Sequence, residues 1–482
     1  MNYTIQSHAA RTNQFNNQTI PHQLHDSTVQ QLHNKMKVTA VFDIGRTNKK
    51  YILFDETYRM VREIREVLPE TVDEDGFPCE DIELLTQWVQ GHWEELKKEE
   101  EFELQAVNVS GYGASFVHLD AWDKPVAPLY SYLKPFPDDL AAQFYGEYGD
   151  PMTIALQTGS PPMGFLNSGL QMYWLKHRRP EVYAEVKTSL HLPQYILFLL
   201  TGRKVSDFTS LGSHTALWSL EMMDYHEWVK AELVDKKMAN LLAASSFIYR
   251  FGNSVIQSGF GIHDSSAALI PYRMAFKKPF ILLSTGTWCV NFNPYATNPL
   301  TSEQLERDCL HFMTPEGSGV KASRVFMGRE HDYQVTRINE YFDLEPEFYR
   351  TIPFDDKYLS QDAPPFYPAH MEGNGPFPEP QPGPWQVSAF ATPEAAYHHL
   401  LIGLTHIVAT SLRLIGVDDI PTLFIDGGFA KNQIFTQLLA REFPDKEVFT
   451  TLLPFAAALG AALHVTRPNK FEFPGEIIRV NG

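Results

Sequence analysis

The chain has 482 residues, of which 44% are hydrophobic and 20% charged, so it is typical of a globular protein and long enough for two or three domains. Its formal net charge of −18, with no basic stripe, argues against nucleic-acid binding. The longest apolar stretches fall far short of the roughly 18 residues of a membrane span, and the first residues lack an apolar signal core. The three cysteines have no metal-ligand spacing. We therefore expect a cytoplasmic protein without a membrane or nucleic-acid partner.

The first 36 residues differ from the rest of the chain. They are rich in Gln, Asn, His and Thr, which predicts a disordered tail. Met36 begins an ordinary strand pattern, so a start codon assigned too early is the alternative. In either case we look for the fold after this segment.

Strands and helices alternate from Met36 onward, which favours an α/β fold. Two apolar runs joined by a short turn (37–43 and 49–55) come first, followed by a strand at 58–68, a helix at 82–98 and a buried strand at 105–113. More helix and strand signals follow, including those at 168–186. A second strand–turn–strand unit begins at Pro279, about 240 residues after the first, which indicates a duplicated core. Residues 353–393 are rich in Pro and Gly and predict a long surface loop.

The first turn, "FDIGRTN", has features of a phosphate cradle. It leads into a strand and not a helix, so it is neither a P-loop nor a dinucleotide fingerprint. A tight hairpin can still bind phosphate through backbone N–H groups and hydroxyls. Gly45 permits close approach, Thr47 and Asn48 offer donors, and Asp43 could hold hydrated Mg²⁺. An ordinary β-turn is the alternative.

Two later stretches add candidate residues. In "TLFIDGGFAKNQ", Gly427 and Gly428 would let the backbone lie flat against a ligand, and Asn432 would cap a helix or contact a base. In "GFGIHDSSAAL", Asp264 is a candidate general base, with an N-cap of a helix starting at Ser265 as the alternative.

Four motifs in this order, "FDIGRTN", "GIHD", "STGTW" and "DGGFAKN", resemble the FGGY family of carbohydrate kinases in the sugar kinase/Hsp70/actin superfamily. The resemblance runs from about residue 37 to residue 465 and includes the segments 192–218 and 456–463. It implies two ribonuclease-H-like α/β domains with the active site in the cleft between them. The boundaries would be 37–273 for the sugar side and 274–482 for the nucleotide side.

The resemblance also implies residue roles for an ATP-dependent kinase. Asp43 would position Mg²⁺ through water, and Asp264 would accept the proton of the attacking sugar hydroxyl. The residues implied to contact ATP are Gly45, Thr47, Asn48, Gly286, Thr287, Gly427, Gly428 and Asn432. The residues expected at the sugar are Ser115, His118, His263 and Asp264, with Ser131 and Tyr132 as further polar candidates.

The sequence departs from many relatives on the sugar side and at two further positions. Arg46 would contact phosphate or face solvent, and Phe455 replaces a glutamate. Arg329 and Glu330 would reach the cleft or form a surface ion pair.

"STGTW" and the motif spacing are most similar to the rhamnulokinase and fuculokinase branch, which implies a ketose such as L-rhamnulose or L-fuculose. A non-catalytic sugar or nucleotide sensor and a chaperone- or actin-like ATPase are the alternatives. A homodimer stays open.

Overall fold

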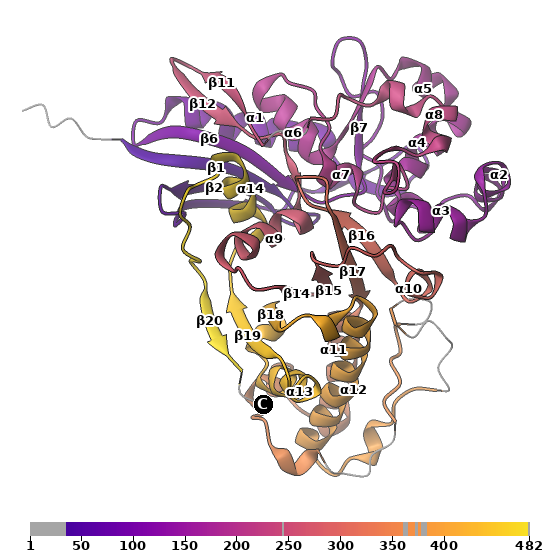
Figure 1. Ribbon diagram of the computed structural model, residues 1–482, viewed down its shortest axis with the longest axis vertical. Helices are drawn as coiled ribbons and strands as arrows, with labels where there is room; N and C mark the ends of the chain where they lie inside the picture. Colours follow the sequence, from indigo (N-terminus) through magenta and orange to yellow (C-terminus); the bar gives the residue numbers. More distant parts are fainter. Residues whose placement is uncertain (1–34, 243–244, 360–364, 372–374, 377–382, 481–482) are drawn as a thin grey trace, which may run out of the picture. The chain divides into compact units, whose positions relative to one another are not determined.

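The structure, a computed structural model, describes residues 35–242, 245–359, 365–371, 375–376 and 383–480 (Figure 1). The predicted tail lies almost wholly outside these residues. The elements below belong to one compact unit, Met36–Gly482, and two seven-stranded sheets dominate it.

The first sheet has the strand order β11-β12-β6-β1-β2-β3, with β13 paired to the end of β6. Strands β3, β2 and β1 are antiparallel neighbours, and β6 and β12 continue the sheet in parallel. Its strands are β1 (Met36–Ile44), β2 (Lys49–Asp55), β3 (Met60–Glu66), β6 (Phe102–Gly111), β11 (Phe247–Phe251), β12 (Ser254–Ser258) and β13 (Ile262–His263).

The second sheet repeats this arrangement. Strands β17, β15 and β14 are antiparallel, and β18 and β19 follow in parallel, with β16 and β20 at the two edges. Its strands are β14 (Phe280–Thr285), β15 (Cys289–Asn293), β16 (Cys309–Met313), β17 (Gly319–Val325), β18 (Thr422–Gly427), β19 (Glu447–Leu452) and β20 (Glu476–Arg479). The predicted duplicated α/β core is therefore confirmed.

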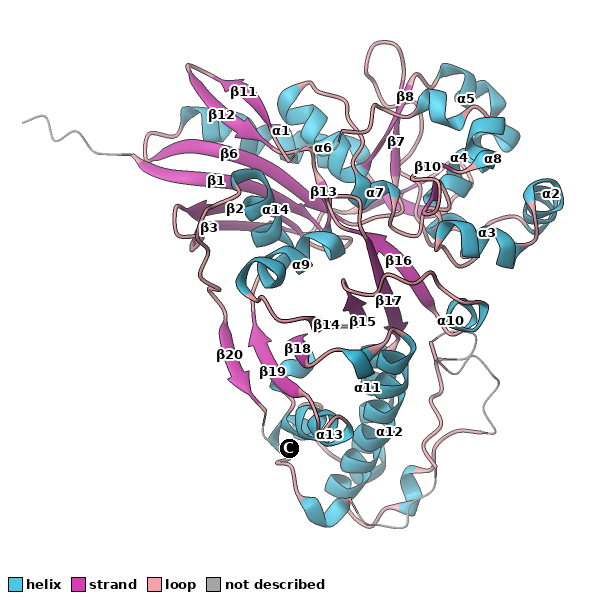
Figure 2. Cartoon of the chain, in the orientation of Figure 1, coloured by secondary structure: helices cyan, strands magenta, loops and turns pink. Residues whose placement is uncertain are grey.

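Helices and three short ribbons surround the sheets (Figure 2). The ribbons pair β4 (Glu70–Val72) with β5 (Pro78–Glu80), β7 (Phe116–Leu119) with β8 (Thr188–His191), and β9 (Trp218–Ser219) with β10 (Asp224–Tyr225). The helices are α1 (Ile82–Lys98), α2 (Asp138–Tyr148), α3 (Pro151–Thr158), α4 (Ser168–Arg178), α5 (Pro180–Glu185), α6 (Leu192–Thr201), α7 (Phe208–Leu211), α8 (Glu227–Ala231), α9 (Asp264–Ala275), α10 (Ser302–Glu306), α11 (Met327–Phe342), α12 (Pro393–Leu414), α13 (Gln433–Glu442) and α14 (Ala456–Thr466).

The chemistry of single residues explains where these helices begin and end. The predicted helix 82–98 is α1, and Asp81 caps it by accepting hydrogen bonds from the backbone N–H groups of Glu83 and Leu84. The segment 168–186, which carries helix and strand signals in the sequence, divides into the two helices α4 and α5. Pro180 is the first residue of α5, where its missing N–H costs nothing.

Successive side chains of β1 point to opposite faces of the first sheet, and each face packs against a different layer. Val38, Ala40, Phe42 and Ile44 of β1 pack in one core with residues of α1 and α6. Val41 faces the other way, into a core that it shares with α9, α14 and the second sheet.

Helices α9 and α14 form a layer that contacts both sheets. Ala267 of α9 and Ala461 of α14 lie in one core with Phe280 and Leu282 of β14. In Figure 1 the yellow helix α14 lies beside the indigo and violet strands β1 and β6, so a helix late in the sequence packs on the first strands. Gly460 allows the close approach, since a Cβ there would lie 1.9 Å from the carbonyl oxygen of Ala267.

Polar contacts connect the two helices to both sheets. The Asn108 amide on β6 donates to the carbonyl oxygen of Ala461 at 2.8 Å. The Tyr272 hydroxyl on α9 donates to Asp426 on β18 at 3.0 Å, and Ser266 donates to the Met313 carbonyl at 2.8 Å. The position of α9 is therefore fixed from both sides.

Within the described residues, no helix is both long and apolar enough to cross a bilayer.

We predict that Gly460→Ala lowers the midpoint of thermal unfolding. Alanine favours a helix over glycine by about 1 kcal/mol, but the backbone contact with Ala267 would force α14 away from α9 at an overpacking cost of about 1–3 kcal/mol. Gly91→Ala is the matched control, because Gly91 lies in α1 with no atom near the added Cβ, and it should raise the midpoint. A Gly460→Ala protein as stable as wild type would contradict the packing argument.

Candidate active site

The turn between β1 and β2 is a tight loop with free donors. The backbone N–H of Gly45 donates to the carbonyl oxygen of Asn48 at 3.0 Å. Thr47 is exposed and Asn48 is half-buried. Among the described residues neither of these two side chains has a hydrogen-bond partner, so both are free to meet a ligand.

Asp43 is the last residue but one of β1, close to this loop, and its neighbour is a lysine that the sequence analysis did not single out. Lys50 on β2 is paired in register with Asp43, and its Nζ lies 2.9 Å from the carboxylate. The same ammonium lies 5.6 Å from the centre of the Phe455 ring. The lysine could have been found by pairing the two predicted strands across the loop.

Asp264 is the first residue of α9, with His263 in the cap position, so the alternative that Asp264 caps a helix starting at Ser265 is wrong. Its carboxylate accepts a hydrogen bond from the backbone N–H of Ser265 at 2.6 Å, and the side chain is 34% exposed. Burial, and next the nearby charge of Asp43, raise the pKa of Asp264 to about 7. The two predicted carboxylates thus lie close together, and one of them changes charge near neutral pH.

A cavity of about 710 Å³ lies where the predicted nucleotide residues converge. Of these residues it contains Gly286, Thr287, Gly428 and Asn432. The residues that the sequence analysis did not single out are Gly328, His331 and Asp332 of α11, the segment 349–353, Phe429, Lys431 and Gln433. Sequence order hides the residues of α11 and 349–353, because both are far from the glycine motifs in the chain, whereas Phe429, Lys431 and Gln433 lie within the quoted segment "TLFIDGGFAKNQ".

Gly427 precedes Gly428 in the chain and is not among the residues that line this cavity. Its φ of +89° and ψ of −156° are available essentially only to glycine, and a Cβ would lie 2.0 Å from the carbonyl oxygen of Thr285. The Thr285 hydroxyl accepts a hydrogen bond from the Phe429 N–H at 3.1 Å. This packing joins the turn that follows β14 to the turn that follows β18.

Asn432 has the structural role that the sequence predicted and also lines the cavity. Its carboxamide oxygen caps α13 by accepting from the Phe435 N–H at 3.1 Å, and its Nδ2 donates to the Tyr397 hydroxyl at 2.8 Å. His331 Nε2 lies 3.1 Å from that hydroxyl. These contacts hold one wall of the cavity.

The predicted sugar-side residues are buried to different extents. His263 lies 3.4 Å from Asp264 through Nε2, and burial lowers the pKa of the His263 imidazole to about 3, so the ring is neutral. His118 is fully buried on β7 and bonds Ser189 at 2.9 Å. Ser115 is also buried. The surroundings of His118 indicate a packing role, and a sugar contact by it stays a prediction.

Two of the charged residues left open by the sequence, Arg46 and Glu330, have definite partners. Arg46 is partly exposed and forms ion pairs with Glu70 and, at 3.7 Å, with Glu80, and a phosphate contact by it stays a prediction. Glu330 is fully buried and accepts hydrogen bonds from the backbone of Ala369 and His370 at 2.9 and 2.8 Å, so its expected place at the cleft or in a surface ion pair is wrong. Arg329 is exposed.

In the part of the chain that the structure describes, no three His, Cys, Asp or Glu side chains converge in a way that could hold a metal ion. A site with few protein ligands fits Mg²⁺, which keeps several waters and binds through one or two carboxylates plus substrate phosphates. Asp43 can supply such a carboxylate.

Comparisons with known proteins agree with this geometry. Residues 38–264 match the family model for the N-terminal domain of the FGGY family of carbohydrate kinases, and residues 277–472 match the model for the C-terminal domain of FGGY carbohydrate kinases. A crystal structure of a carbohydrate kinase from Novosphingobium aromaticivorans superposes with a TM-score of 0.76 at 24% identity, covering 92% of this chain and 96% of that one. The two-domain fold is therefore the one that the motifs predicted.

Two curated relatives have more specific names. A rhamnulokinase of Halalkalibacterium halodurans is 24% identical over 267 residues, which are 52% of this chain and 55% of that protein. A rhamnulokinase of Oceanobacillus iheyensis is 20% identical over 372 residues, which are 70% of this chain and 73% of that protein. The match thus spans little more than half the length of the first relative.

We predict opposite outcomes for two adjacent glycines. Gly427→Ala should destabilise the protein, because a strained backbone of this kind costs about 1–3 kcal/mol and the Cβ would also collide with Thr285. Gly428→Ala places its Cβ in open space at the cavity, so stability should stay within about 0.5 kcal/mol while the affinity for Mg-ATP falls. Thermal unfolding and calorimetric titration measure the two effects, and equal melting points would refute the assignment.

Proposed function

Because the chain belongs to the FGGY family of carbohydrate kinases, which are phosphotransferases with an alcohol group as acceptor, we propose that it transfers the γ-phosphoryl group of ATP to a sugar hydroxyl. The observation that carries the proposal is the arrangement of Asp264, Asp43 and Lys50 at the first phosphate loop. A carboxylate whose pKa is raised to about 7 is suited to accept a proton at neutral pH.

In this proposal Asp264 removes the proton of the attacking hydroxyl. The adjacent Ser265 N–H keeps the carboxylate oriented, and neutral His263 adds no competing charge. Thr47 and Asn48 donate to the γ-phosphate, and Lys50 offsets its negative charge. Phosphoryl transfer needs little covalent help and much positioning and neutralisation of charge, which these residues would supply in a protein of net charge −18.

Sugar kinases of this family use ATP with a divalent metal ion. We propose Mg²⁺ as that ion, held through water by Asp43, where it would neutralise charge on the phosphates. The 710 Å³ cavity is the proposed nucleotide site, with Gly286 and Thr287 at the phosphates and Gly428 and Asn432 along the adenosine. Gly427 would act indirectly, by shaping the turn that carries Gly428.

The proposed acceptor is a ketose such as L-rhamnulose or L-fuculose. Support comes from the two relatives named rhamnulokinase and from the "STGTW" motif. His263 and Tyr132 are proposed sugar contacts, since His263 lies 3.4 Å from Asp264 and the Asp264 charge acts on the Tyr132 hydroxyl. Ser115 also stays a proposed contact, and His118 is the least favoured because its ring is fully buried and bonds Ser189.

A non-catalytic sensor on the same fold is the alternative, and a base poised near neutral pH favours the kinase.

The domain division at residues 273 and 274 falls between the two family models. The three cysteines are buried and free, which suits the proposed cytoplasmic location.

We predict that Asp264→Asn retains Mg-ATP binding and loses about 10²- to 10⁴-fold in turnover, which is the usual contribution of a general base. A coupled ADP-release assay with Mg-ATP would be run on L-rhamnulose, L-fuculose, L-ribulose, L- and D-xylulose and glycerol. Turnover of one ketose by the wild type alone supports the proposal. A loss below tenfold would show that Asp264 is not the base.

Activity should also depend on pH with a definite sign. The reactive form of Asp264 is the carboxylate, so kcat/KM for the sugar should fall about tenfold per pH unit below pH 7 and level off above it. Rates measured from pH 5 to 9 test this. A profile that is flat through pH 7 would contradict the assigned base.

A further inference from the structure

The short ribbon of β4 and β5 lies outside both large sheets and contacts the first phosphate loop and the segment 129–134. Glu70 and Glu80 are paired across the ribbon, and Glu80 forms a further bridge with Leu129. The turn between the strands, residues 73–77, contacts the same segment from its other end. Nothing in the chemistry proposed above uses this ribbon.

At the strand end, Glu80 and Lys49 hold the phosphate loop from within the protein. Lys49 is 2% exposed. Its Nζ donates to the carbonyl oxygens of Gly45 at 2.9 Å and Arg46 at 3.1 Å, and it pairs with Glu80. The Tyr112 hydroxyl donates to the other carboxylate oxygen of Glu80 at 2.9 Å. All three donors of the ammonium are thus used inside the protein, so Lys49 orients the loop and has no donor left for substrate.

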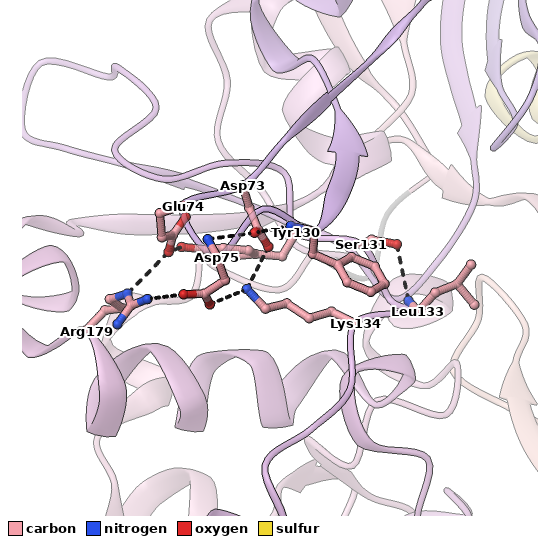
Figure 3. Close-up of polar contacts among 9 residues, drawn as sticks. Asp73, Glu74, Asp75, Tyr130, Ser131, Leu133, Lys134 and Arg179 are labelled. Carbon is pink, nitrogen blue, oxygen red and sulfur yellow. Dashed lines mark hydrogen bonds and ion pairs between the residues drawn. The ribbon is translucent and has the colours of Figure 1, made fainter.

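At the turn end, carboxylates hold Lys134 (Figure 3). Its Nζ lies 2.6 Å from Asp73 and 2.7 Å from Asp75. Lys134 is 8% exposed, and the side chain of Asp73 is wholly buried. Arg179 pairs with Asp75 at 2.6 Å, and the Tyr130 hydroxyl donates to Glu74 at 2.6 Å. The turn 73–77 therefore fixes the segment 129–134 through Tyr130 and Lys134.

The segment 129–134 also contains Tyr132, which is one of the proposed sugar contacts. The Tyr132 ring lies 6.0 Å from the ring of Tyr112, which is bonded to Glu80. Burial raises the pKa of the Tyr132 hydroxyl, the Arg46 charge opposes the rise and the Asp264 charge adds to it, so both charged groups act on this hydroxyl. The same ribbon thus reaches the phosphate loop and the segment that carries Tyr132.

We propose that the β4–β5 ribbon is a positioning strut that fixes the first phosphate loop relative to Tyr132, through Lys49 and Glu80 at one end and Lys134 and Asp73 at the other. The inference rests on the proposed kinase function. Transfer requires reacting atoms about 3–3.5 Å apart, so a small misplacement of either side lowers the rate. The strut residues touch neither substrate and act through the residues that do.

The test separates the two ends. Lys134→Met/Asp73→Asn removes the acceptor-end pair without leaving an unpaired buried charge. It should raise the sugar KM about fivefold or more and lower kcat, with the affinity for Mg-AMP-PNP unchanged in calorimetry. Lys49→Met/Glu80→Gln should weaken Mg-AMP-PNP binding about tenfold and lower kcat. Lys204→Met, which removes an ion pair with Asp123 elsewhere, is the control and should leave both unchanged.

The proposal is overturned if the Lys134→Met/Asp73→Asn protein keeps KM and kcat within twofold of wild type, or loses nucleotide affinity as much as the Lys49→Met/Glu80→Gln protein does. A wild type that phosphorylates none of the sugars would refute the kinase proposal. The nucleotide measurement would still decide the strut's phosphate-loop end, since it needs no sugar. Melting curves of all variants exclude general unfolding as the cause.

Discussion

The contact between α9 and α14 at Gly460 and Ala267 is the constraint on which the rest of the structure depends. Each sheet packs one face on this helix pair, and the catalytic candidate Asp264 is the first residue of α9. The position of that carboxylate is therefore set by a close helix contact and not by its own loop. Protein interiors are closely packed and transmit strain, so a shift of α14 against α9 would also move the Asp264 carboxylate.

Charge in the site is balanced locally. Burial and next the charge of Asp43 raise the pKa of Asp264, and the charge of the Lys50 ammonium, which lies 2.9 Å from Asp43, opposes the rise. A cation or phosphate that changes the charge around Asp43 would therefore alter the basicity of Asp264. In the proposed kinase, the residues that would hold the phosphates would therefore also tune the base, and an acidic protein would bind an anionic nucleotide without a basic surface.

Much of the fold could be predicted because it depends on short-range patterns. The two strand–turn–strand units, α1 and the glycine turns follow from periodicity and backbone requirements that the residues themselves impose. What sequence could not give depends on distant contacts. Glu330 looked like a surface charge because its partners, the backbone N–H groups of Ala369 and His370, carry no sequence signal. Lys49 and Lys50 are adjacent and alike in sequence, yet opposite strand faces give them different partners.

The return of α14 to the first sheet also bears on how the protein can be made. The Asn108 amide on β6 bonds the carbonyl oxygen of Ala461, 353 residues later in the chain. During synthesis, the part of the first sheet that α14 covers must therefore stay uncovered until nearly the whole chain has been translated. Contacts of such high sequence separation close slowly, so this uncovered face is where a nascent chain would need a chaperone.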